Sequence, residues 1–278
     1  MRYAGEGRFG SRLLGGYLVL FFLFLEAPII IIFLASFNDG PTVRFPPTGF
    51  SLQWYRELLN IAQDGSGTKP GLVKALWTSA TLGLVSMIGA VFAGVLAAYG
   101  IERYRFRGRA LLRQALLLPL LFPQIVTGIG LLLWFSQIGS VPTWLRLLIG
   151  HLIMTLPYVV VTVSASLQTL DPRLEEAAMN LGANRISTFW HITIPSIRSG
   201  IVSGAIFAWL ISFSNFTVSF FLYSGEVTPL PTWLYEYLQY FLDPSIAALS
   251  TLLIVCTFLV LAIANRLFAL GRLVGLRK

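Results

Sequence analysis

Six long apolar stretches limit what this chain can fold into more than any other feature. They cover about residues 13–37, 72–100, 111–135, 144–168, 197–223 and 245–268. A helix needs about 20 apolar residues to cross the hydrocarbon core of a bilayer. The stretches lack the alternation of membrane-barrel strands, and a chain that is 56% hydrophobic and 12% charged cannot bury so much apolar surface in water. We therefore predict an all-α, polytopic membrane protein with six spans in one domain, 1–278.

The positive charges are concentrated in four of the segments outside these stretches. The N-terminal tail, the 101–113 loop, the 169–198 loop and the C-terminal tail together hold 15 of the 20 lysines and arginines. Cytoplasmic loops of membrane proteins carry such an excess. We therefore predict that both termini and these two loops are cytoplasmic. The net charge of +8 then reports topology and does not indicate nucleic-acid binding.

The segment 171–195, DPRLEEAAMNLGANRISTFWHITIP, has the pattern of a short helix that ends in a turn. Asp171 suits the N-cap, and Pro172 suits the first helical position. One apolar stripe at helical spacing contains Leu174, Ala177, Ala178 and Leu181. Gly182 suits a left-handed turn. Because the helix has only about ten residues, it is too short to span a bilayer, and we expect it to dock onto another surface.

This segment resembles the EAA loop of ABC importer permeases, whose pattern is EAA-x3-G-x9-I-x-L-P. The matching residues are Glu176, Ala177, Ala178, Gly182, Ile192 and Pro195, and Ile194 replaces the family's leucine. The resemblance implies a type I ABC importer permease fold, in which these residues form a cytoplasmic coupling helix and loop on a partner ATPase. A helix lying on lipid is the alternative. It would favour a basic polar face, but this face carries Glu175, Glu176 and Asn180.

Three weaker segments resemble the spermidine/putrescine-type branch of binding-protein-dependent transport system inner membrane components. They are GFSLQWYRELL (49–59), YRFRGR (104–109) and LPYVVVTVSASL (156–167). The branch implies a second, homologous permease subunit, two cytoplasmic ATPases that bind ATP and Mg²⁺, and a periplasmic or extracellular substrate-binding protein. It implies a bacterial inner (plasma) membrane location and a polyamine, amino acid or related amine-containing cargo. A homodimeric permease stays open.

The chain has no recognisable enzyme site of its own. Residues 5–11 come nearest to a phosphate-binding loop but lack its lysine. The two histidines, His151 and His191, and the single cysteine, Cys256, form no metal-binding or nucleophile–base spacing. We therefore predict no catalytic residue, metal or cofactor in this chain, and expect His151 to cap or pack near an outer helix end. An ion-coupled secondary transporter is the alternative function, although it would leave the EAA-like segment unexplained.

Two polar and aromatic stripes are candidates for the substrate pathway. The third stretch carries Gln124, Thr127, Leu131 and Trp134 at helical spacing, and the fifth carries Trp209, Ser212, Phe216 and Ser219, with Asn215 beside them. Such a lining offers hydrogen bonds and cation–π faces. Polar packing between helices is the alternative. Polyamine-type relatives often have acidic residues at the positions of Gln124 and Asn215, so a dication would lose its counter-charges here.

Glu26 is a further candidate for the pathway, because it lies near the middle of the first apolar stretch. An ionised side chain at that depth costs on the order of 3 kcal/mol on insertion scales, and such residues are usually functional. Glu26 could bind a cationic group of the cargo or pair with an arginine of a partner permease. It could also be protonated and packed beside Pro28.

Two further patterns predict packing. Gly200 and Gly204, at the start of the fifth stretch, form a G-x-x-x-G motif that permits close approach of another helix. In the loop between the first two stretches, Trp54, Leu58 and Leu59 can share one face, which predicts a short interfacial helix.

Overall fold

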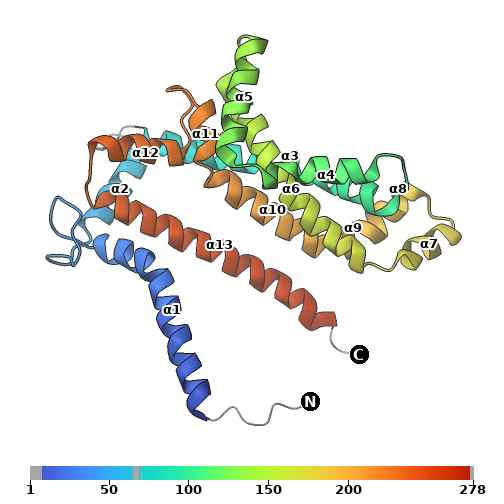
Figure 1. Cartoon of the computed structure of the whole chain (residues 1–278), viewed down its shortest axis with the longest axis horizontal. Helices are drawn as coiled ribbons and strands as arrows, with labels where there is room; N and C mark the ends of the chain where they lie inside the picture. The colour runs from blue at the N-terminus through green and yellow to red at the C-terminus, as the bar shows by residue number, and fades with distance from the viewer. Residues whose placement is uncertain (1–7, 65–68, 70, 276–278) are drawn as a thin grey trace. The chain divides into compact units, whose positions relative to one another are not determined.

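A computed structural model describes residues 8–64, 69 and 71–275, and their regular structure is helical (Figure 1). The helices are α1 (Arg8–Ala35), α2 (Gln53–Asp64), α3 (Leu72–Arg103), α4 (Arg109–Leu121), α5 (Gln124–Ile138), α6 (Thr143–Thr169), α7 (Pro172–Asn180), α8 (Arg185–Thr188), the π-helical turn η1 (Phe189–Thr193), α9 (Ile194–Ser196), α10 (Arg198–Phe213), α11 (Thr217–Leu222), α12 (Leu230–Tyr240) and α13 (Ser245–Gly275). The chain separates into two compact units. The all-α prediction is confirmed.

Residues up to 70 and residues 238–260 form the first unit, which contains α1, α2 and the first half of α13. Helix α2 packs against the residues that directly follow α1. The indole Nε1 of Trp54 donates to the carbonyl oxygen of Asn38 at 2.7 Å, and the hydroxyls of Ser36 and Tyr55 lie 2.6 Å apart. The short helix predicted in this loop is therefore present as α2 and is tied to the end of α1 by polar side chains.

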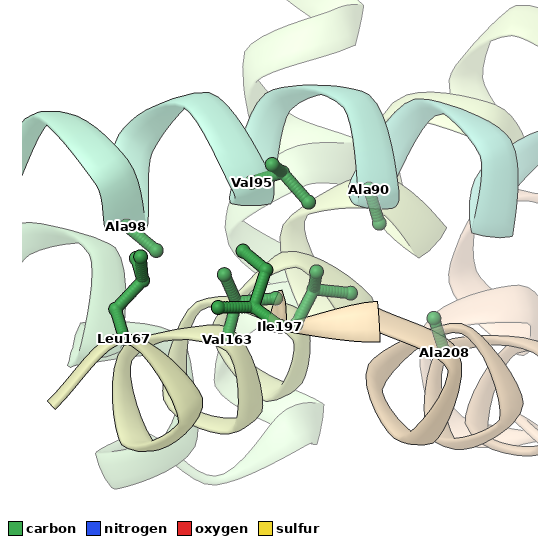
Figure 2. Packing of buried hydrophobic residues seen from close by; sticks show 8 residues of the cluster. Ala90, Val95, Ala98, Val163, Leu167, Ile197 and Ala208 are labelled. Carbon is green, nitrogen blue, oxygen red and sulfur yellow. The ribbon is translucent and has the colours of Figure 1, made fainter. Parts of the chain in front are cut away.

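The second unit, residues 71–237 and 261–278, is built on α3, α6 and α10. Small and β-branched side chains fill the space between these three helices, so their backbones come close together. Figure 2 shows this core, whose residues are Ala90, Val95, Ala98, Val159, Val163, Leu167, Ile197 and Ala208. Because lipid tails are as apolar as these side chains, close van der Waals packing is what holds the helices together.

The G-x-x-x-G motif of α10 lies at its contact with α6, as predicted. A Cβ atom on Gly200 would lie 2.7 Å from the carbonyl oxygen of Thr162, and a Cβ atom on Gly204 would lie 3.1 Å from the Cα of Val159. On α3, a Cβ atom on Gly94 would lie 2.8 Å from Cγ1 of Val159. Only glycine fits at these three positions without moving the neighbouring helix.

Two of the six predicted spans are not continuous helices. The third, 111–135, is divided into α4 and α5, which meet at an angle of 106° (Figure 1). Phe122 has extended backbone angles and Pro123 follows it, as expected where a proline excludes the helical conformation of the preceding residue. The fifth, 197–223, is divided into α10 and α11. There Asn215 Oδ1 accepts from the backbone N–H of Val218 at 2.9 Å and so caps the second piece.

The other four spans are present as single helices within a few residues of the predicted bounds. By length and composition of the described residues, four helices can cross a membrane, and the number rises to six if each bent pair counts as one span. The second bent pair joins residues 185–196 to α10 at 71°. The upper count of six equals the number of predicted spans, but its second bent pair includes residues 185–196 and leaves out α11, unlike the predicted span 197–223.

Replacing Gly200 by alanine should destabilise the second unit, because the added methyl would meet the backbone of α6. Overpacking of this kind costs about 1–3 kcal/mol. The thermal unfolding midpoint in detergent measures the effect. Gly130→Ala is the matched control, since nothing lies within 4 Å of a Cβ atom at Gly130. Equal midpoints for the two variants would contradict the packing described here.

Candidate functional site

The segment 171–195 folds as its sequence predicts at both ends of the first helix. The Asp171 side chain accepts a hydrogen bond from the backbone N–H of Arg173 at 3.0 Å, and Pro172 begins α7. Gly182 has φ of +93°, in the left-handed region that favours glycine. The Asn184 side chain then caps α8 by accepting from the backbone N–H of Ser187 at 2.7 Å. The result is a helix, a tight turn and a second helix, placed between α6 and α10.

The apolar stripe of α7 faces away from the other helices of the second unit. Leu174 is 53% exposed and Leu181 is 91% exposed. Two more large apolar side chains are exposed in the following turns, Ile186 and Trp190. In the following text, the docking face means Leu174, Ala177, Leu181, Ile186 and Trp190. An apolar face of this kind between two long helices is typical of a surface that another protein covers.

The residues that match the EAA pattern are mostly accessible. Glu176, Ala177, Gly182 and Pro195 are exposed, and Ala178 and Ile192 are half-buried. Their assignment to ATPase coupling stays a prediction, because it depends on a partner surface.

Glu175 differs from the expectation that it lies on the solvent-facing polar side of the helix. It is only 6% exposed. Its Oε2 accepts from Arg103 Nε at 2.7 Å, and its Oε1 accepts from the hydroxyl of Thr193 at 2.5 Å. Arg103 also donates to the carbonyl oxygen of Leu170 at 3.3 Å. The side of α7 that carries Glu175 is therefore fixed to the end of α3 by a buried ion pair and to η1 by a hydrogen bond.

The two predicted pathway stripes meet at the breaks in their helices. The Asn215 amide Nδ2 donates to Gln124 Oε1 at 3.4 Å, joining the break after α10 to the start of α5. Asn215 is buried and Gln124 is exposed. The polar side chains at the two helix breaks thus bond to each other, and at the break after α10 the Asn215 side chain also satisfies a released backbone N–H, as is needed at membrane depth.

His151 lies beside this break and is fully buried, so of the two roles expected from the sequence, capping or packing, it has the packing role. Its Nδ1 lies 2.7 Å from the hydroxyl of Ser212 and its Nε2 lies 2.9 Å from the hydroxyl of Ser219. The Ser219 hydroxyl donates its hydrogen to the carbonyl oxygen of Asn215 at 2.6 Å. It must therefore accept from Nε2–H, so a neutral ring leaves Nδ1 to accept from Ser212. The imidazole bridges the last turn of α10 to α11 across the break.

The other predicted pathway residues are distributed differently. Thr127 and Trp209 are half-buried, and a Cβ atom on Gly83 would lie 3.2 Å from Cδ1 of Trp209. Trp134 is exposed on α5. Glu26 belongs to α1 in the first unit, and its side chain is exposed. The structure therefore brings together Gln124, Ser212, Asn215 and Ser219. It adds His151, for which the sequence indicated only a capping or packing role, because a lone histidine in a long helix carries no spacing signal for its partners.

Broken spans around a core of small residues, with a helix–turn–helix segment between two long helices, define the fold of type I ABC importer permeases. A bacterial ABC transporter involved in import of the acidic polysaccharide alginate has this fold, with a TM-score of 0.68, 18% identity and coverage of 96% of this chain and 99% of that chain. An amino acid ABC transporter with histidines also matches, with a TM-score of 0.55, 17% identity and coverage of 75% of this chain and 97% of that chain.

The chain belongs to the family described as binding-protein-dependent transport system inner membrane component, whose sequence model matches residues 90–270. It is 32% identical to the spermidine/putrescine transport system permease protein PotC of Escherichia coli (strain K12), over 96% of this chain and 97% of the relative. It is 32% identical to the putrescine transport system permease protein PotI of the same organism, over 85% and 84% of the two chains. The chain is therefore an inner membrane transport permease of an ABC importer and not an enzyme.

Replacing Ser219 by alanine should destabilise the protein, because His151 Nε2–H would lose its acceptor in a buried site. An unsatisfied buried donor costs about 1–3 kcal/mol. Ser214→Ala is the matched control, since the exposed Ser214 hydroxyl donates only to Leu210 in its own helix. The measurement is again the thermal midpoint in detergent. A Ser219→Ala protein as stable as the Ser214→Ala protein would exclude the bridging role of His151.

Proposed function

We propose that this chain is one of two homologous permease subunits of an ATP-driven importer, and that α7 is its coupling helix. The observation that carries the proposal is the arrangement of α7. Its apolar docking face is open to a partner, while the side that carries Glu175 is anchored by the buried Glu175–Arg103 ion pair. A helix that only lay on lipid would need no such anchor, and its polar face would be basic.

The docking face is proposed to fit a groove on a cytoplasmic ATPase, with Glu176, Ala177, Ala178, Gly182, Ile192 and Pro195 as the coupling residues. Two ATPase subunits, one for each permease, would bind the ATP and Mg²⁺. A substrate-binding protein outside the membrane would deliver the cargo. A related fold supports this last partner, since a bacterial alginate ABC transporter was solved in complex with a periplasmic protein that carries an alginate pentasaccharide.

The proposed orientation places both termini and the coupling segment in the cytoplasm. Arg103 contacts Glu175 and Leu170, so the arginine-rich loop after α3 and the coupling segment lie at the same end of the second unit. A basic excess at one end of a bundle is the usual signature of its cytoplasmic side.

The proposed cargo is a small amine-containing solute, a polyamine or an amino acid. The names of the relatives PotC and PotI support the polyamine class. The candidate pathway groups are the uncharged amides of Gln124 and Asn215, the hydroxyls of Thr127, Ser212 and Ser219, the indoles of Trp134 and Trp209, and the carboxyl of Glu26. Amides and rings can solvate an ammonium group without trapping it.

Transport would follow from movement of the coupling helices. When the ATPases close on ATP, they push the two coupling segments and open the pathway to the outside, where the binding protein releases cargo. Release of ADP and phosphate restores the inward-facing state. The chain's own residues supply the docking face, the anchor and the hinge regions at the helix breaks.

Reconstitution tests this function directly. The chain is co-expressed with the ATPase, permease and binding protein encoded beside it, and the complex is placed in liposomes with a panel of polyamines and amino acids. We expect one cargo-loaded binding protein to stimulate ATP hydrolysis and cargo uptake together. If no ATPase co-purifies with the chain, the proposed function is wrong. If an ATPase binds but a different solute class is taken up, only the cargo assignment is wrong.

Replacing Gly182 by valine should reduce uptake per ATP hydrolysed, because a β-branched residue disfavours φ of +93° and would shift the turn after α7. Strain at such a position is of order 1–3 kcal/mol. Gly139→Val is the matched control, since Gly139 has φ of +97° and also has open space around it, but ends α5. Equal coupling ratios in the two variants would show that the turn is not part of coupling.

A further inference from the structure

We propose that Glu175 and Arg103 are positioning residues that transmit movement of the coupling helix to both breaks in the candidate pathway. This inference rests on the proposed function, because it requires α7 to be moved by an ATPase. It concerns residues on the side of α7 away from the docking face, which no partner needs to touch.

The Glu175 carboxylate joins three segments of the chain. One oxygen binds Arg103 at the last residue of α3, and the other binds Thr193 in η1, which leads through α9 into α10. The carboxylate is 8% exposed in its side chain and the arginine is 14% exposed, so water screens this pair little. Two directed bonds from one short side chain make α7 move together with the ends of both helices.

The first route continues from α3 to α4. Glu102, next to Arg103, binds Arg113 of α4 in an ion pair, and its Oε2 lies 3.8 Å from Arg109 Nη2. The Glu102 side chain is 7% exposed. Neighbouring residues at the end of α3 therefore hold the coupling helix and α4. Helix α4 is 13 residues long, about 20 Å, and ends beside Pro123 and Gln124.

The second route continues from η1 to α10. Ile197, the residue before α10, is fully buried in the core with Ala98 and Leu167, so the start of α10 is held between α3 and α6. Helix α10 is 16 residues long, about 24 Å, and ends beside Asn215. The two routes start at one carboxylate and end at the two side chains that meet at 3.4 Å, Asn215 and Gln124.

The contact between Asn215 and Gln124 can change when either of the two helix breaks moves. The hydrogen bond between Asn215 and Gln124 is long, and it joins two breaks, residues 122–123 between α4 and α5 and residues 214–216 between α10 and α11. Helix breaks absorb backbone rotation while the helices move as rigid bodies. Moving α7 changes the separation of Asn215 and Gln124 only if both routes remain connected at Glu175.

The test compares the coupling ratio, cargo molecules imported per ATP hydrolysed, in the reconstituted complex. The main variant is Arg103→Met combined with Glu175→Met, which removes the ion pair without leaving one charge buried and unpaired. Thermal midpoint and co-purification with the ATPase are measured on the same sample. We expect the ATPase to co-purify as with the wild type and the midpoint to fall only by the loss of the acceptor for Thr193. The coupling ratio should fall about tenfold, in the usual range of coupling energies.

The matched control is Lys69→Met combined with Glu57→Met, which removes a second ion pair of the same length, 2.7 Å between Lys69 Nζ and Glu57 Oε1, in the other unit. A role of Glu175 in folding alone predicts that a stable double variant retains the wild-type ratio, and that result overturns the proposal. A complex in which the wild-type chain binds no ATPase overturns the proposed function instead.

Glu175→Gln keeps the test decisive if the double methionine variant does not assemble. Glutamine retains an acceptor for Thr193 but loses the charge that holds Arg103. We expect ATPase binding to persist and the coupling ratio to fall several-fold. An unchanged ratio in Glu175→Gln contradicts the proposal, because the route through Arg103 would then be unnecessary.

Discussion

The close approach of α3, α6 and α10 is the constraint on which the second unit depends. Gly94, Gly200 and Gly204 remove side chains where these helices meet, and alanine and valine fill the remaining space. In a bilayer the hydrophobic effect does not drive helices together, so this van der Waals packing supplies the energy of their association. A tightly packed core cannot deform smoothly, so displacement at one end is passed on as rigid-body movement of its helices.

Polar side chains are used where this core stops being regular. Pro123 separates α4 from α5, and residues 214–216 separate α10 from α11. At the second break, Asn215 caps the new helix and His151 bridges Ser212 to Ser219. These bonds satisfy groups that would be costly to leave unpaired in lipid. The same breaks lie where the candidate pathway residues gather, so the interruptions of regular structure and the proposed function coincide.

Charge has a different role at the arginine-rich end. Glu102 and Glu175 are both nearly buried and both bind arginines. Through the consecutive residues Glu102 and Arg103, the end of α3 is therefore tied to α4 and to α7. Exposed ion pairs contribute little to stability, whereas buried pairs with fixed geometry specify one arrangement of segments. Here they fix the base of α7, while its docking face remains exposed.

Local patterns in the sequence determined much of this protein. Hydropathy located the spans, the Asp171–Pro172 start and Gly182 located α7, and the spacing of six residues indicated the family, because each signal depends only on neighbouring residues or fixed intervals. Tertiary structure alone decided that Pro123 turns the third span by 106°, that Glu175 is buried against Arg103, and that His151 bridges two helices. These contacts join residues up to 72 positions apart. Sequence patterns repeat over a few residues, so they do not indicate which distant residue will be the partner.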